Sequence, residues 1–351
     1  MKTLKNVTLW GVITDISVEN GKIIEIGKSD RPGVDFSGFK IYPGLIDIHV
    51  HGCIGYDTME GGLPEMSDWL LSKGTTAWYP TTMSMSLGDV ARATSADIDF
   101  GHGAVIPGFH LEGPFINKIY KGAMNEKFII PPSLDFFKFL KNVKRITVAP
   151  EMPSAIDFIK SCGIQVSLGH TDTDYETART AFSAGATSIT HTFNAMKGIH
   201  HREPGLIAAG FDEKNVFAEL ICDGIHVHPS AVRLLIKLFG TERVILISDS
   251  MRATGLGDGR YSFGGQSVTV ENSVAMTDTK NLAGSVSTLF DCVKNAVKFG
   301  IPEYDAVKMA SENPARLMGL NKGKIEVGYD ADFIIVDENF NLVRAIARGE
   351  F

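Results

Sequence analysis

Several short apolar runs of this chain end in residues that can bind a metal ion or transfer a proton. These residues are His49, His51, Glu112, His170, His191, His226 and Asp249. Imidazole and carboxylate groups are the usual ligands of a catalytic zinc ion, which keeps one position open for water. Each residue alone could be an ordinary polar side chain at the end of a strand. Together, so many potential ligands in equivalent positions predict a metal-dependent active site.

The runs that carry these residues alternate with helical patterns between residues 42 and 322. We expect eight strands, at 45–51, 75–83, 104–112, 145–151, 165–170, 188–194, 216–227 and 244–250. Helical patterns are found at 63–73, 90–98, 134–141, 175–184, 230–239, 285–299 and 304–318. This alternation predicts a parallel sheet, and eight strands fit a (β/α)8 TIM-type barrel of about 250 residues. The active site of such a barrel lies at the C-terminal ends of its strands.

Both ends of the chain have the alternating pattern of antiparallel sheet. Residues 3–41 contain Asn20-Gly21 between two such runs, which is a strong hairpin signal. Gly264-Gly265 predicts another hairpin after the eighth barrel strand, and further runs follow at 324–327, 332–336 and 342–347. Two β segments on either side of a barrel can pair only if the chain ends meet. We therefore predict one discontinuous β-sandwich domain, residues 1–41 and 323–351, and a barrel domain, residues 42–322.

Composition restricts the class of partner. The chain has 351 residues, of which 44% are hydrophobic, enough for a sizeable core. Its formal net charge of -7 argues against a surface for nucleic acid or anionic membrane, since both normally require a basic field. No apolar stretch predicts a signal peptide or a membrane span. The four cysteines are scattered without a Cys-x-x-Cys motif, which predicts reduced thiols and a cytoplasmic protein.

Longer motifs surround the candidate ligands. They are His-Val-His-Gly at 49–52, Leu-Glu-Gly-Pro-Phe at 111–115, Ser-Leu-Gly-His at 167–170, His-Thr-Phe-Asn-Ala-Met at 191–196, Arg-Glu-Pro-Gly at 202–205 and Asp-Gly-Ile-His at 223–226. In this order, the motifs resemble those of the amidohydrolase superfamily and, within it, the N-acetylglucosamine-6-phosphate deacetylase family. The resemblance covers essentially the whole chain. His-x-His is shared across the superfamily, whereas the motifs at 111–115 and 191–196 are specific to this branch.

The resemblance implies a metal-dependent hydrolase that removes the acetyl group of N-acetylglucosamine 6-phosphate. Glu112, His170 and His191 would bind the main divalent ion, Zn²⁺ or else Fe, Mn or Co, and Asp249 would be the catalytic acid and base. The sugar phosphate would lie against Ala123, Asn194, Ala195, His226, Leu282, Ala283 and Gly284. Arg202 would reach the phosphate bound by a neighbouring subunit, which implies a homodimer.

Two features leave the chemistry partly open. Some family members lack the strand-1 histidines and use one ion, so His49 and His51 allow a second metal site here. The family commonly has His or Gln where this chain has Met124. Because methionine cannot donate a hydrogen bond to the acetyl oxygen, we expect an ion at the histidine pair to polarise the carbonyl instead. Met124 also leaves the sugar open, with N-acetylgalactosamine 6-phosphate as an alternative.

Two other functions remain as alternatives. Many cyclic amidases of the superfamily bridge two metals with a carboxylated lysine at the end of strand 4, where this chain has Val-Ala-Pro-Glu at 148–151. Glu112 is the more natural bridge, which disfavours a cyclic amidase. A barrel that only binds sugar phosphates is disfavoured by the complete donor set and by Asp249.

Overall fold

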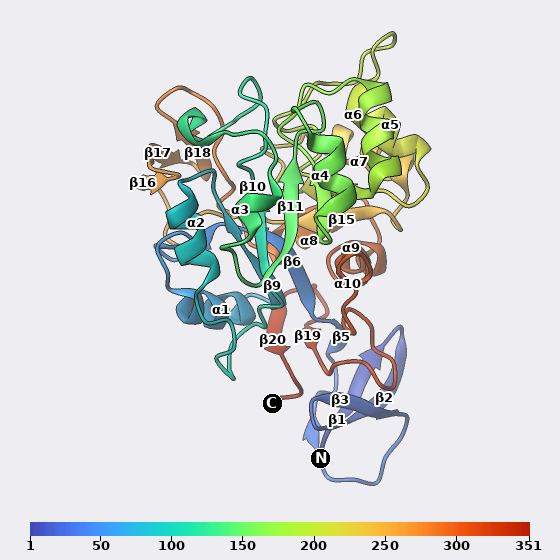
Figure 1. Ribbon diagram of the computed structural model, residues 1–351. Helices are drawn as coiled ribbons and strands as arrows, with labels where there is room; N and C mark the ends of the chain where they lie inside the picture. Colours follow the sequence, from blue (N-terminus) through green and yellow to red (C-terminus); the bar gives the residue numbers. More distant parts are fainter.

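A closed parallel barrel forms the centre of the molecule in the computed structural model, which describes residues 1–351 (Figure 1). Its eight strands are β6 (Leu45–Val50), β9 (Thr75–Thr82), β10 (Phe109–Glu112), β11 (Val143–Val148), β12 (Gln165–Leu168), β13 (Ala186–Ile189), β14 (Phe217–Ile221) and β15 (Val244–Ile247). The first and last strands are joined by a parallel bridge between Val50 and Ser250 and by a 3.0 Å hydrogen bond from Asp249 N to His49 O. The predicted (β/α)8 barrel is confirmed.

Helices cover the outside of this barrel (Figure 1). They are α1 (Leu63–Ser72), α2 (Leu87–Thr94), α3 (Leu134–Phe137), α4 (Ala155–Ser161), α5 (Tyr175–Ala184), α6 (Gly205–Asp212), α7 (Pro229–Phe239), α8 (Leu289–Lys298), α9 (Glu303–Met309) and α10 (Glu312–Met318). In α7, for example, Val232, Leu235, Ile236 and Phe239 recur at helical spacing and are buried. Packing of such apolar stripes on the strands builds the main core of the molecule.

The continuous helix predicted at 304–318 is wrong, because the chain breaks between α9 and α10. Pro314 explains the break: in one long helix its ring would clash with the carbonyl of Ala310. In α10, Pro314 lies within the first turn. A backbone N–H at this position would have no intrahelical acceptor, so its absence in proline breaks no hydrogen bond. Ser311, just before α10, turns the backbone with φ of -136° and ψ of -72°.

All eight predicted barrel strands are longer than the observed ones, and the differences are largest for the runs at 104–112 and 216–227. The run at 104–112 contains Pro107, which cannot donate to a strand ladder, and β10 begins only at Phe109. The run at 216–227 ends as strand β14 at Ile221. Beyond it, Asp223 Oδ1 accepts the backbone N–H groups of Ile225 and His226, both at 2.8 Å, and so forms a turn. His226 therefore lies on a loop and not at the tip of a strand.

The two ends of the chain pair in one mixed sheet of seven strands. They are β1 (Lys2–Leu9), β2 (Val12–Glu19), β3 (Lys22–Ile26), β4 (Val34–Asp35), β5 (Lys40–Pro43), β19 (Phe333–Val336) and β20 (Leu342–Ile346). Strand β19 from the C-terminal end runs antiparallel to β5, and the sheet has its own core with Leu4, Ile16 and Phe333 at its centre. The predicted β unit made from both ends is confirmed, while its boundaries at 41/42 and 322/323 stay a prediction.

The strand predicted at 324–327 is wrong. Gly328 N donates to Ile23 O at 2.8 Å, and Tyr329 N donates to Glu326 O at 3.1 Å, so this segment turns on itself and forms no ladder. Ile325 nevertheless lies in the core of the sheet. Its apolar character is explained by packing alone.

A small three-stranded sheet follows β15, made of β16 (Gly259–Phe263), β17 (Gln266–Glu271) and β18 (Val274–Thr277). Gly264 and Gly265 form the predicted turn, with φ of +58° and +76°. A second turn at Asn272-Ser273, also with positive φ, separates β17 from β18. A short hairpin of β7 (Gly52–Cys53) and β8 (Tyr56–Asp57) follows β6. None of the helices has the length and apolar character needed to span a lipid bilayer.

Candidate active site

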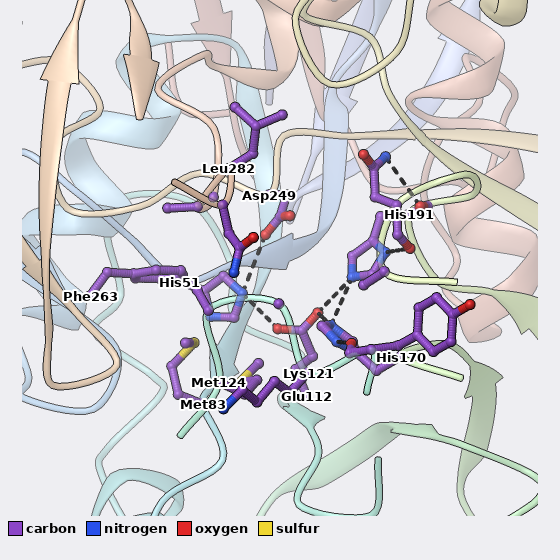
Figure 2. Close-up of a pocket in the computed structure, with 18 of the residues that line it drawn as sticks. His51, Met83, Glu112, Lys121, Met124, His170, His191, Asp249, Phe263 and Leu282 are labelled. Carbon is purple, nitrogen blue, oxygen red and sulfur yellow. Dashed lines mark hydrogen bonds and ion pairs between the residues drawn. The ribbon is translucent and has the colours of Figure 1, made fainter. Parts of the chain in front are cut away.

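A cavity of about 350 Å³ opens at the C-terminal ends of the barrel strands (Figure 2). Six of the residues expected to carry chemistry line it: His51, Glu112, His170, His191, His226 and Asp249. The residues expected against the sugar phosphate also line it: Ala123, Asn194, Ala195, Leu282, Ala283 and Gly284. His49 lies beneath the cavity with no exposed surface. Arg202 does not belong to the lining.

Glu112, His170 and His191 form one compact group of candidate metal ligands. Glu112 Oε1 lies 3.1 Å from His170 Nε2 and 2.9 Å from His191 Nε2, and these two nitrogens are 3.1 Å apart. The other ring nitrogens face backbone carbonyls: His170 Nδ1 lies 2.8 Å from Tyr120 O, and His191 Nδ1 lies 3.2 Å from Asn194 O. An Nδ1–H donated to a carbonyl leaves the Nε2 lone pair free for a metal. The group therefore fits a divalent ion.

Unusual backbone conformations direct these side chains into the cavity. His170, His191 and Asp249 have φ values of 49°, 27° and 48°, in the left-handed region that side chains disfavour. Each stands two residues beyond the end of its strand, β12, β13 or β15. Such strain persists only where surrounding structure imposes it and is concentrated at functional sites.

His49 and His51 form a second candidate ligand group with the same glutamate. Glu112 Oε2 lies 3.1 Å from His51 Nε2, and Glu112 Oε1 lies 3.2 Å from His49 Nε2. The two imidazole Nε2 atoms are 3.3 Å apart, and His51 Nδ1 lies 3.1 Å from the carbonyl of Thr81. Glu112 thus stands between the two groups, in the position of a bridging carboxylate. The second group fits a divalent ion as well.

The charge around this corner of the cavity favours a cation. Burial by itself lowers the pKa of His51, but the carboxylates of Asp249 and Glu112 outweigh burial and raise that pKa to about 9. Asp249 Oδ1 lies 3.3 Å from His51 Nε2. Burial raises the pKa of Asp249, and the neighbouring histidines more than compensate, so its net pKa lies below the ordinary value. Asp249 is therefore ionised and able to accept a proton.

Two charged residues beneath the cavity were not expected from the sequence. Glu219 on β14 has its Oε2 atom 3.4 Å from His49 Nδ1, and the same oxygen accepts the backbone N–H of His191 at 3.3 Å. Arg145 on β11 pairs with Glu219 through Nη2. Both side chains have no exposed surface, and burial lowers the pKa of Arg145 to about 9. The sequence signal for this pair was a glutamate inside the otherwise apolar strand β14, while Arg145 on β11 follows another basic residue, Lys144.

His226 is held as a double hydrogen-bond donor. Its Nδ1 lies 2.6 Å from Asp223 Oδ2, and its Nε2 lies 2.9 Å from Ala283 O. Both partners are acceptors, so both ring nitrogens must carry a proton, and this occurs only in the imidazolium form. Burial alone would lower the pKa of His226, but Asp223 and Ala283 raise it above its ordinary value. His226 thus places a positive charge at the cavity wall.

Arg202 lies on an exposed loop outside the cavity. Its Nη1 lies 2.8 Å from His201 Nε2, and His200 and His201 beside it are exposed too. Residues 200–202 contribute nothing to the cavity of their own subunit, although His191, Asn194 and Ala195 of the same loop line it. Met124, by contrast, is 3% exposed and belongs to the cavity wall.

The sequence and fold were compared with known proteins. The model of the amidohydrolase family matches residues 41–351. An N-acetylglucosamine-6-phosphate deacetylase of Bacillus subtilis (strain 168) is 36% identical over 362 aligned positions, which cover 95% of this chain and 91% of the relative.

Solved structures of N-acetylglucosamine-6-phosphate deacetylases are similar to this chain as well. The N-acetylglucosamine-6-phosphate deacetylase of Thermotoga maritima matches with a TM-score of 0.93 and 33% identity, over 99% of this chain and 98% of the other. A mutant of the corresponding deacetylase of Mycobacterium smegmatis, solved in complex with N-acetyl-D-glucosamine-6-phosphate, matches with a TM-score of 0.92 and 27% identity, over 99% and 98% of the two chains.

Proposed function

The chain belongs to the amidohydrolase family, and from this premise we propose that it hydrolyses the acetamide of N-acetylglucosamine 6-phosphate to glucosamine 6-phosphate and acetate. One observation carries the proposal: Glu112, His170, His191 and Asp249 converge in a single cavity at the C-terminal ends of the barrel strands. An amide hydrolase requires such a combination of a cation site and an ionised carboxylate.

Glu112, His170 and His191 would hold the main divalent ion, which we propose to be Zn²⁺, since three imidazole and carboxylate ligands with an open position are typical of catalytic zinc. Fe, Mn and Co are the alternatives. His49 and His51 would share Glu112 with a second ion. When bound, the ions activate water for attack and polarise the acetyl carbonyl, a task for which Met124 has no hydrogen-bond donor.

Asp249 carries the proton transfers. As an ionised carboxylate it accepts a proton from the attacking water and then delivers it to the nitrogen of the leaving amine, which cannot depart as an anion. Its place beside His51, 3.3 Å from Nε2, supports this role. Almost complete burial of the carboxylate keeps bulk water from competing for the proton.

The sugar phosphate would bind on the remaining wall of the cavity. His226 supplies a positive charge for the phosphate, with Asn194, Ala195, Ala123, Leu282, Ala283 and Gly284 around the sugar. Arg202 would complete the phosphate site from the neighbouring subunit of a homodimer, because its planar guanidinium suits a phosphate and it lies outside its own cavity. The four unpaired cysteines suit a reducing compartment, and we place the protein in the cytoplasm.

The test is an assay of acetate release by purified, metal-analysed protein. N-acetylglucosamine 6-phosphate should be hydrolysed faster than N-acetylgalactosamine 6-phosphate and much faster than unphosphorylated N-acetylglucosamine. Asp249→Asn should lower kcat by about 10²- to 10⁴-fold while the metal content is retained. Equal rates with the unphosphorylated sugar would contradict the roles of His226 and Arg202, and tight binding of the phosphorylated sugars without turnover would indicate a sugar-phosphate-binding barrel.

A further inference from the structure

The wall of the cavity next to His51 is apolar, whereas the rest of the lining mixes apolar and polar side chains. Met83, Met124 and Phe263 form this wall, and Figure 2 shows all three on the His51 side, away from His170 and His191. The side chains come from separate parts of the chain: Met83 follows β9, Met124 lies in the loop after β10, and Phe263 ends β16. We refer to these three residues as the methionine wall.

Specific contacts hold the methionine wall in place. The backbone N–H of Ser84 donates to Met124 Sδ at 3.3 Å, which fixes the position of the thioether. The Phe263 ring packs edge-on against His51, with centroids 5.1 Å apart. Gly264 lies so close to Met83 that a Cβ atom there would be 2.7 Å from Met83 Cε. The hairpin of β16 and β17 therefore closes this side of the cavity.

Next to His191, on the side away from the methionine wall, the lining includes the polar side chain of Asn194. Asn194 accepts a hydrogen bond from His191 Nδ1 through its backbone oxygen and donates from its side-chain amide to His191 O at 3.3 Å. The single lysine of the lining, Lys121, pairs through Nζ with Glu126 Oε2 at 2.7 Å and brings no free charge to the methionine wall. The reacting groups thus lie between the apolar methionine wall and a side of the cavity that offers hydrogen-bonding groups.

Given the proposed function, this arrangement indicates which side of the cavity binds the acyl group of the amide substrate and which side binds the sugar phosphate. In the hydrolysis, the water oxygen bonds to the acyl carbon, the C–N bond breaks, the amine gains a proton and the acyl group leaves as a carboxylate. The acyl carbon must therefore lie next to Asp249. Its two substituents, the amide nitrogen with the sugar and the acyl chain, then extend to opposite sides of the cavity. The sugar phosphate matches the polar side, so the acyl chain extends toward the methionine wall.

We propose that the methionine wall is an acyl-binding subsite that accepts N-acyl groups longer than acetyl. Methionine is unbranched, has three rotatable bonds and adapts to irregular apolar shapes. Each further methylene buried against it strengthens binding by up to about fourfold, which offsets the cost of accommodating the longer chain. A rigid pocket that fits the acetyl group closely would instead discriminate against an extra methylene by about 10- to 200-fold. The substrate class is thus the N-acyl amino-sugar phosphates, including N-propionyl and N-butyryl derivatives.

The experiment measures release of glucosamine 6-phosphate from its N-acetyl, N-propionyl and N-butyryl derivatives by the metal-loaded protein. The wild type should hydrolyse the N-propionyl compound with a kcat/KM within about threefold of the N-acetyl value. Met124→Gln should lower the propionyl-to-acetyl ratio by at least about tenfold, because it places an amide against the added methylene. Met83→Ala should raise the butyryl-to-acetyl ratio by enlarging the subsite.

Matched controls keep the result specific. Met318 on α10 is partly buried and does not line the cavity, so Met318→Gln and Met318→Ala should leave both ratios unchanged. A ratio measured within one protein does not depend on how much of a variant folds. Turnover of the N-acetyl compound with rejection of the N-propionyl one by 100-fold or more would overturn the subsite alone. No turnover of any N-acyl compound would overturn the proposed function and the subsite with it.

Discussion

Glu219 is a buried carboxylate in contact with both groups of candidate metal ligands. It lies 3.4 Å from His49 Nδ1 and accepts the backbone N–H of His191 at 3.3 Å. A carboxylate on the far nitrogen of a ligating histidine sets its tautomer, and its loss costs about 10- to 100-fold in metal affinity. We predict that Glu219→Gln lowers the affinity for the ion at His49 and His51 by about this factor, measured by metal analysis after dialysis.

The control and a compensating variant separate this effect from unfolding. Glu338→Gln changes an exposed glutamate and should bind metal as the wild type does. Removal of one member of a buried ion pair also costs about 3–5 kcal/mol of stability. For this reason the double variant Arg145→Met with Glu219→Gln, which removes the unpaired charge of Arg145, is measured as well. Unchanged affinity in both Glu219 variants would show that Glu219 only stabilises the barrel.

His226 predicts a pH dependence of substrate binding. Asp223, helped by Asp249, raises its pKa above the ordinary value against the effect of burial. The positive charge is present below this raised pKa and is lost as pH rises through it, so KM for the phosphorylated sugar should increase on the alkaline side of pH 6.5. Asp223→Asn should lower the pKa of His226 and move the increase in KM to lower pH. Superimposable KM profiles for the two proteins would contradict the role of His226.

Among the helices, α8 has the most complete N-terminal cap. Thr288 Oγ1 accepts the backbone N–H of Asp291 at 3.1 Å, and Asp291 Oδ2 accepts that of Thr288 at 2.9 Å, a reciprocal capping box. Thr288→Ala should lower the free energy of unfolding by about 0.5–2 kcal/mol in urea denaturation. Its kcat/KM should not change, since Thr288 does not line the cavity. Thr180→Ala, an exposed position within α5, is the control, and equal stability of the two variants would refute the prediction.

Elements with a clear local pattern could be predicted, and those without one could not. Helix α5 was predicted with its observed ends, 175–184, and in the structure Asp174 caps it and Gly185 follows its last residue. Helix α6 was missed, since Gly205–Asp212 is apolar nearly all round and shows no helical stripe. Histidines and carboxylates after strands identified the cavity. The pairing of Glu219 with Arg145 joins β14 to β11 across the barrel interior, a contact that no spacing in the sequence encodes.

At the scale of the whole molecule, the segment His200-His201-Arg202 has no role within its own subunit. It is exposed and its guanidinium contacts only the neighbouring His201 among side chains, while the cavity of its own subunit is formed without it. A phosphate in an acidic protein needs local cations, and Arg202 has the appropriate geometry. In a symmetric dimer the same loop of each subunit would meet the same site of the other. Arg202 should then act only in the partner's cavity.

Mixed dimers test this prediction directly. Arg202→Ala and Asp249→Asn proteins should each be nearly inactive at low substrate concentration. If they are co-expressed in equal amounts, about half of the dimers combine one chain of each kind. In such a dimer, the Arg202→Ala chain keeps Asp249 and receives Arg202 from its partner, so one of its two sites is complete. The mixture should therefore recover about a quarter of wild-type activity per chain. If Arg202 acted within its own subunit, every site would lack either Arg202 or Asp249, and mixing would recover nothing.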